Sequence, residues 1–109
     1  MALAEVAGGT QAAEIGTEHT LATETGGKTY VLVVSMANLV NGDTVELRLK
    51  TKVRTGNSSQ LAYGAVYTHA QSELNKYSIP VPANIELIAT LKQVAGTGRD
   101  FIWALLSLD

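Results

Sequence analysis

The chain has no cysteine, and this absence excludes three kinds of chemistry. Without thiols there is no disulfide bond, no thiolate zinc site and no cysteine nucleophile. Aromatic residues are also scarce, at 6% of the composition, and proline occurs only twice. A chain of 109 residues is expected to form one domain, and it is long enough to bury a single core without such staples.

Long apolar runs are absent as well. The longest run spans residues 101–106, well short of the ~20 apolar residues that a membrane-spanning helix needs. The N-terminal stretch MALAEVAGG has no basic region and no long apolar core, so we expect no secretory signal here. We therefore expect no membrane partner.

Charge is low overall but unevenly placed along the chain. The formal net charge is −2 and the pI is about 5.6, which argues against a nucleic-acid partner. Residues 1–24 contain four Glu and no Lys or Arg, whereas residues 28–54 contain five basic and two acidic residues. Such asymmetry indicates either surfaces that meet charged partners or ordinary surface polarity.

The periodicity is that of strands, without a convincing helical period. Short segments that alternate or are rich in β-branched residues are separated by glycine, asparagine and proline. The segment YSIPVP (77–82) contains two prolines and predicts an edge or a corner, and AGTGRD (95–100) predicts a hairpin loop. Seven or eight short strands result, and they predict an all-β, single-domain antiparallel β-sandwich, in its finer form a jelly roll. A closed barrel is the alternative.

The sequence also predicts how this domain is divided and which side chains face inward. Residues 1–16, rich in Ala and Gly, predict an N-terminal arm or a weak edge strand, and residues 17–109 form the sandwich. In 28–38, one parity holds Tyr30, Leu32, Val34 and Met36, but the other parity is apolar too. The segment 101–108 shows the same double pattern. We expect both segments to be central strands, with 101–108 buried on both faces.

Four cations dominate one parity of the segment VELRLKTKVR (45–54). Val45, Leu47 and Leu49 would face the core, which leaves a row of basic side chains on the other face: Arg48, Lys50, Lys52 and Arg54. This row fits a solvated face or a docking face for an acidic protein surface, and it lacks the interleaved aromatics of a nucleic-acid site. Together with Glu5 and Glu14 of the acidic N-terminal segment, these four residues are the candidate partner-binding residues.

No catalytic or metal-binding constellation can be assembled from the sequence. His19 and His69 have no carboxylates or further ligands at a useful spacing, and the ten acidic residues are scattered. The GTGR stretch (96–99) lies between two predicted strands, so no helix N-terminus supports it as a phosphate loop. We predict no enzyme activity and no cofactor. An alternative function is carbohydrate binding on a stacking surface built from Tyr63, Tyr67 or Trp103, although the alternation around Tyr63 and Tyr67 is more typical of a core.

Three stretches carry a resemblance to a known class of proteins: VNGDTVELRLKTKV, QLAYGAVYTHAQSE and LKQVAGTGRDFIWALLSL. With them, the chain resembles the small jelly-roll decoration or cement proteins of tailed bacteriophage heads. The resemblance implies a non-enzymatic virion structural protein, made in the host cytoplasm, that binds the major capsid protein on the head surface and bridges capsomers. It implies a homo-oligomer, a dimer or a trimer. A tail or head–tail connector component fits the same resemblance, and no functional residue is transferred from it.

Overall fold

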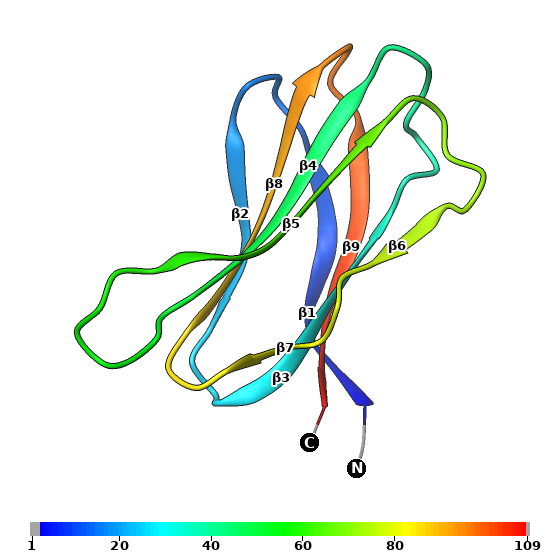
Figure 1. The fold of residues 1–109 in the computed structure, drawn as a ribbon. Coiled ribbons are helices and arrows are strands. Elements are labelled where there is room, and N and C mark those ends of the chain that lie inside the picture. Colours follow the sequence, from blue (N-terminus) through cyan, green and yellow to red (C-terminus); the bar gives the residue numbers. More distant parts are fainter. Residues whose placement is uncertain (1–2, 109) are drawn as a thin grey trace.

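The computed structural model describes residues 3–108, and its regular structure is entirely β-strand (Figure 1). Within that range the chain forms nine strands: β1 (Leu3–Ala12), β2 (Glu18–Glu24), β3 (Lys28–Ser35), β4 (Thr44–Thr51), β5 (Gln60–Thr68), β6 (Asn75–Tyr77), β7 (Val81–Ala83), β8 (Leu87–Ala95) and β9 (Asp100–Leu108). The prediction of an all-β chain is confirmed. The search for a helix long and apolar enough to span a membrane found none in the described part of the chain.

The strands form two antiparallel sheets that face each other as a sandwich (Figure 1). Sheet 1 has the order β1-β9-β3-β6, with β7 also paired to β3, and sheet 2 has the order β2-β8-β4-β5. Between residues 3 and 108, β4 and β5 are the only consecutive strands that pair with each other. The predicted antiparallel sandwich is therefore confirmed at this level.

Alternation within the strands builds the core between the sheets. Each inward side chain is buried while its sequence neighbours on the same strand are more exposed. Burying a side chain of this size stabilises the fold by about 1.5–3 kcal/mol relative to leaving it in water. The core includes Tyr30, Leu32 and Val34 of β3, Val45, Leu47 and Leu49 of β4, Leu87, Ala89 and Leu91 of β8, and Phe101 and Leu105 of β9. The inward parity predicted for the segment that became β4 is confirmed. In β3, where both parities are apolar, the parity of Tyr30, Leu32 and Val34 faces the core.

The predicted strand count of seven or eight is exceeded because the region around Pro80 is split in two. Strands β6 and β7 both pair with β3, on either side of Leu32. Between them Ser78 continues the contact with Leu32: its N–H donates to the Leu32 carbonyl at 2.8 Å, and its Oγ accepts from the Leu32 N–H at 2.9 Å. Pro80 and Pro82 have no N–H to donate, so this edge of sheet 1 is interrupted where the prolines predict an edge.

The predicted hairpin at residues 95–100 is wrong. Strand β8 belongs to sheet 2 and β9 to sheet 1, so this segment crosses between the sheets. The crossing is held by Asp43, whose side chain is only 2% exposed. Its carboxylate accepts from the Val40 and Thr97 N–H groups at 3.1 and 3.3 Å and from Arg99 Nε at 2.8 Å. The Arg99 contact and the backbone donors hold the pKa of Asp43 below its ordinary value of 3.8, against the opposing effect of burial.

The N-terminal segment is a strand of sheet 1. Strand β1 pairs with β9 from Leu3, opposite Leu108, to Ala12, opposite Asp100. Val6 and Ala7 pack against the core from this strand. Residues 3–12 of the predicted arm therefore order on their own chain as an edge strand. Residues 1 and 2 of that predicted segment, and residue 109 of the predicted sandwich, lie outside the described range.

Candidate interaction surface

The outer face of sheet 2 carries the predicted cations, and three of them are already paired. Arg48 Nη2 lies 3.0 Å from Glu46, Lys50 Nζ 2.9 Å from Glu18, and Lys52 Nζ 3.7 Å from Glu86. These side chains are all partly exposed, and ion pairs of this kind stabilise a protein by only about 0–1 kcal/mol. Their effect is to neutralise the row, so this face offers an acidic partner much less attraction than the sequence suggests.

Glu18 is the best-held acid on this face. It comes from β2, and its carboxylate accepts from the Thr90 hydroxyl of β8 at 2.7 Å and from Lys50 of β4 at 2.9 Å. These two donors hold the pKa of Glu18 below its ordinary value of 4.5. The charged side chains therefore tie three neighbouring strands of sheet 2 together on their solvent side.

The other predicted partner-binding residues lie elsewhere, so the structure does not bring the set together. Strand β4 ends at Thr51, which places Arg54 in the exposed β4–β5 loop. Glu14 is exposed in the connection after β1, where its backbone N–H donates to His19 Nε2 at 3.1 Å. Glu5 lies on the outer face of sheet 1. The six residues thus occupy four separate parts of the surface.

The outer face of sheet 1 is of a different kind, because it is mostly apolar and has almost no charge. We call it the β9 face. The register of β1, β9, β3, β6 and β7 gives its members: Leu3, Glu5, Gly8, Thr10, Thr29, Val31, Val33, Ser35, Asn75, Tyr77, Pro82, Ile102, Ala104, Leu106 and Leu108. The one charged side chain among these residues is Glu5.

Apolar side chains on this face stand in solvent. Leu3, Tyr77 and Ile102 are 61%, 60% and 62% exposed. The prediction that residues 101–108 are buried on both faces is therefore wrong. β9 is central, between β1 and β3, but the described residues supply no third layer over its outer side. Apolar residues at both parities of β3 and β9 did indicate a second apolar face on these strands. Sequence reasoning missed that this face is left exposed to solvent.

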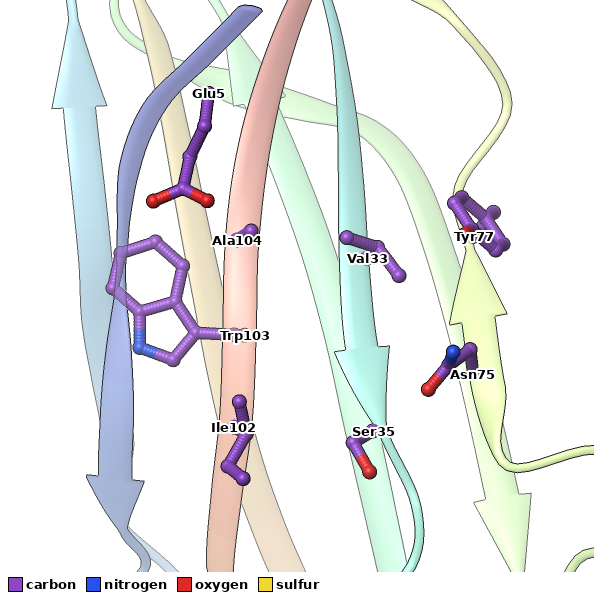
Figure 2. A pocket seen from close by; sticks show the side chains of 8 residues that line it. All are labelled: Glu5, Val33, Ser35, Asn75, Tyr77, Ile102, Trp103 and Ala104. Atoms are coloured by element: carbon purple, nitrogen blue, oxygen red, sulfur yellow. The ribbon is translucent and has the colours of Figure 1, made fainter.

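A shallow depression of about 300 Å³ is hollowed into the β9 face (Figure 2). Val33 of β3 and Ala104 of β9 lie in its middle, with Tyr77 and Asn75 of β6 at one side. Ile102, Ser35 and Trp103 complete the lining together with Glu5 of β1. The hollow therefore combines an apolar floor with an amide, a hydroxyl and one carboxylate.

Gly8 of β1 leaves the space that the Glu5 side chain occupies. A Cβ at Gly8 would stand 2.8 Å from Glu5 Oε2 and 3.2 Å from the Trp103 carbonyl oxygen. The chain also shifts register between Glu5 and Ala7, a bulge that aims the Glu5 side chain. Within residues 3–108, the Glu5 carboxylate has no ion pair and accepts no hydrogen bond. Its carboxylate thus stands at the edge of an apolar hollow without a counter-charge.

Each of the two histidines accepts a hydrogen bond from a backbone N–H group. His69 Nδ1 accepts from the Gly42 N–H at 2.9 Å, and His19 Nε2 accepts from the Glu14 N–H. No group of three or more His, Cys, Asp or Glu side chains in the described part of the chain could hold a metal ion.

The aromatic residues considered for sugar stacking are divided between the sheets. Tyr63 and Tyr67 of β5 are half-buried against the core, and Lys76 Nζ lies 5.2 Å from the centre of the Tyr67 ring. Burial, with Tyr63 nearby, raises the pKa of Tyr67. Trp103 belongs to β9 in the other sheet, beside Gly9. These three rings do not form one continuous platform.

Comparison with protein-family models, with curated proteins and with solved structures gives no match for this chain.

Proposed function

We propose that this protein is a non-catalytic virion structural protein that decorates the head of a tailed bacteriophage and binds the major capsid protein through the β9 face. The observation that carries the proposal is the contrast between the two outer faces. The sheet 2 face exposes Leu61 and Val66 among several paired charges, whereas the β9 face exposes Leu3, Tyr77 and Ile102 with Glu5 as its one charged side chain. Exposed apolar patches of this kind on small proteins commonly mark interaction sites.

The size of the β9 face suits attachment by many copies. Four strands about 4.8 Å apart and roughly eight residues long at 3.3 Å each cover about 400–500 Å². That is somewhat less than the ~800 Å² that each partner of a standard protein interface buries. One copy would therefore bind weakly, and stable attachment would come from avidity when linked copies bind a repeating lattice together. A capsid supplies such a lattice.

The strand order supports the finer fold that this proposal uses, a jelly roll. If β6 and β7 are counted as one interrupted strand, eight strands remain. In each pair, the two strands then lie equally far from the middle of the chain: β1 pairs with β9, β2 with β8, β3 with β6 and β7, and β4 with β5. This is the pattern of one long antiparallel hairpin rolled into two facing sheets, which is how a jelly roll is built. The resemblance to phage decoration proteins implies the same fold.

The experiment is a binding assay on purified, undecorated heads of the phage that encodes the chain. The protein is mixed with heads and sedimented, and the bound fraction is measured against protein concentration. Val31→Glu introduces a charge at the centre of the β9 face, and Leu3→Glu introduces one at its edge. A buried, unpaired carboxylate costs far more than a solvated one, so each variant should bind at least about tenfold more weakly.

Leu61→Glu is the matched control. Leu61 is 59% exposed on β5 and lies opposite Lys50, so the new carboxylate sits on the sheet 2 face near a cation. This variant should bind heads like the wild type, and circular dichroism should show all three variants folded. Wild-type protein that fails to sediment with heads would refute the capsid assignment. Equal binding by Val31→Glu and Leu61→Glu would refute the role of the β9 face.

A further inference from the structure

The geometry points to a self-association contact in which the β4–β5 loop of one copy inserts Val53 and Arg54 into the depression on the β9 face of a second copy, where Arg54 meets Glu5. The inserted part is a loop that stands away from the sandwich. In Figure 1 the connection between β4 and β5 projects beyond the body of the molecule. Val53 at its base is 76% exposed, a higher fraction than any other large apolar side chain in the described residues.

The loop contains a hydrogen-bonded turn of its own and is otherwise largely exposed to solvent. Residues 53–58 are all exposed, and the Asn57 N–H donates to the Arg54 carbonyl at 3.1 Å, which closes a turn. The loop therefore exposes an apolar side chain, Val53, and a guanidinium, Arg54, at consecutive positions of the chain. Hydration of such an apolar tip is unfavourable, so the loop gains stability where it is covered.

The depression offers the complementary chemistry. Its floor of Val33 and Ala104 is apolar, and Glu5 supplies one carboxylate at its edge (Figure 2). A volume of about 300 Å³ equals the liquid volume of about ten waters at ~30 Å³ each, enough for one or two side chains but not for a strand. An arginine fits because its aliphatic stem packs on apolar surface while its guanidinium donates two parallel hydrogen bonds to a carboxylate.

Arg54 is the cation best placed to make this contact. Arg48, Lys50, Lys52 and Arg99 form ion pairs within the chain, and Lys76 lies over Tyr67. Lys92 has no ion pair with a described residue either, but it lies within the sheet 2 ladder, opposite Glu18 and Glu46, and not on a projecting loop. Arg54 has no ion pair with any described residue, just as Glu5 has none. Arg54 on a projecting loop and Glu5 at the edge of a hollow are therefore opposite charges that can pair between two copies.

In this contact, the loop of a second copy covers the depression, which is one part of the β9 face. The rest of the face remains uncovered. Leu3, Val31, Leu106 and Leu108 lie outside the depression. It joins two different surfaces of the chain, so two copies can exchange loops in a dimer or several copies can close a ring. Linked copies would supply the avidity that the proposed capsid attachment needs, but the contact itself is tested without capsids.

The test measures self-association of the purified full chain by sedimentation velocity over a range of concentrations. Glu5→Arg and Arg54→Glu should each weaken association at least about tenfold, because each places like charges together in the hollow. The combined variant restores opposite charges and should recover association to within about threefold of wild type. Glu73→Arg is the control for net charge, since Glu73 is exposed in the loop before β6, and it should associate like wild type. A thermal melt of each variant separates loss of contact from loss of fold.

Cross-linking provides a second readout that does not depend on charge. The chain has no cysteine, so Arg54→Cys and Glu5→Cys proteins each carry a single thiol. Mixed and mildly oxidised, they should form a disulfide joining position 54 to position 5, identified by mass spectrometry after digestion. A strictly monomeric wild type, or association that persists unchanged in both single charge variants, would overturn this inference. If association behaves as expected but heads are not bound, only the proposed function fails.

Discussion

Replacing Asp43 by alanine tests the part of the fold that holds the sheet crossings together. The Asp43 carboxylate is nearly fully buried and accepts from the Val40 and Thr97 N–H groups and from Arg99 Nε. The net contribution is about 1 kcal/mol for each backbone hydrogen bond and about 1.5–2 kcal/mol for the charge-assisted bond to Arg99. We therefore expect Asp43→Ala to lower the free energy of unfolding by ~3–4 kcal/mol.

The same loss can be expressed as a melting temperature. With an unfolding entropy of about 2.1 cal/mol/K per residue, a chain of 109 residues has about 0.23 kcal/mol/K, so Tm should fall by about 13–17 °C. Thermal and urea unfolding followed by circular dichroism measure both quantities. Asp100→Ala removes an exposed carboxylate from the residue that follows Arg99 and should change stability by less than ~0.5 kcal/mol. A loss below ~1 kcal/mol for Asp43→Ala would show that the crossings do not depend on this carboxylate.

Three further predictions follow from the same contacts. The pKa of Asp43 in the folded state lies below its ordinary value of 3.8. The stabilising effect of this carboxylate should therefore be complete above about pH 4 and be lost as the pH falls through the folded-state pKa. The Asp43→Ala variant should lose less stability than the wild type over that acid range. Gly96→Ala should lower the free energy of unfolding by at least ~2 kcal/mol, because Gly96 has φ +92° and a Cβ there would collide with the Asp43 carboxylate. Gly56→Ala is the matched control: Gly56 has φ +91°, but a Cβ there meets no neighbour, so the loss should be only the ~1 kcal/mol of backbone strain. Lys50→Ala should cost ~1 kcal/mol or less, and the cost should shrink in high salt; a loss of several kcal/mol would contradict the view that the sheet 2 ion pairs are surface pairs.

The inward parity of β4 could be predicted from the sequence because it is local. Val45, Leu47 and Leu49 alternate with charged, more exposed neighbours, and a period of two fixes which side chains share a face whatever the strand pairs with. The assignment of strands to sheets is not local. The crossing at 95–100 has glycines that suit a hairpin, and only the long-range contacts of Asp43 with Thr97 and Arg99 show that it links two sheets.

The candidate site was predicted least well, for two physical reasons. Charge alternation in 45–54 revealed the cations and Glu46 beside them, but not the acidic partners of Lys50 and Lys52, since Glu18 and Glu86 come from distant parts of the chain. The apolar outer side of β9 was visible in the sequence, but apolar residues at both parities describe a covered strand and an uncovered adhesive strand equally well. A covered strand and an uncovered one differ in whether a further layer lies over the sheet, and only the arrangement of the two sheets in the structure shows this.

A cryo-electron microscopy reconstruction of phage heads incubated with the wild-type protein would show which sheet meets the capsid. We expect density for the sandwich on the outer head surface with β1, β9 and β3 toward the capsid protein and the ion-paired face of β4 and β8 toward solvent. A reconstruction in which the sheet 2 face contacts the capsid, or in which the β9 face stands uncovered in solvent, would contradict this expectation.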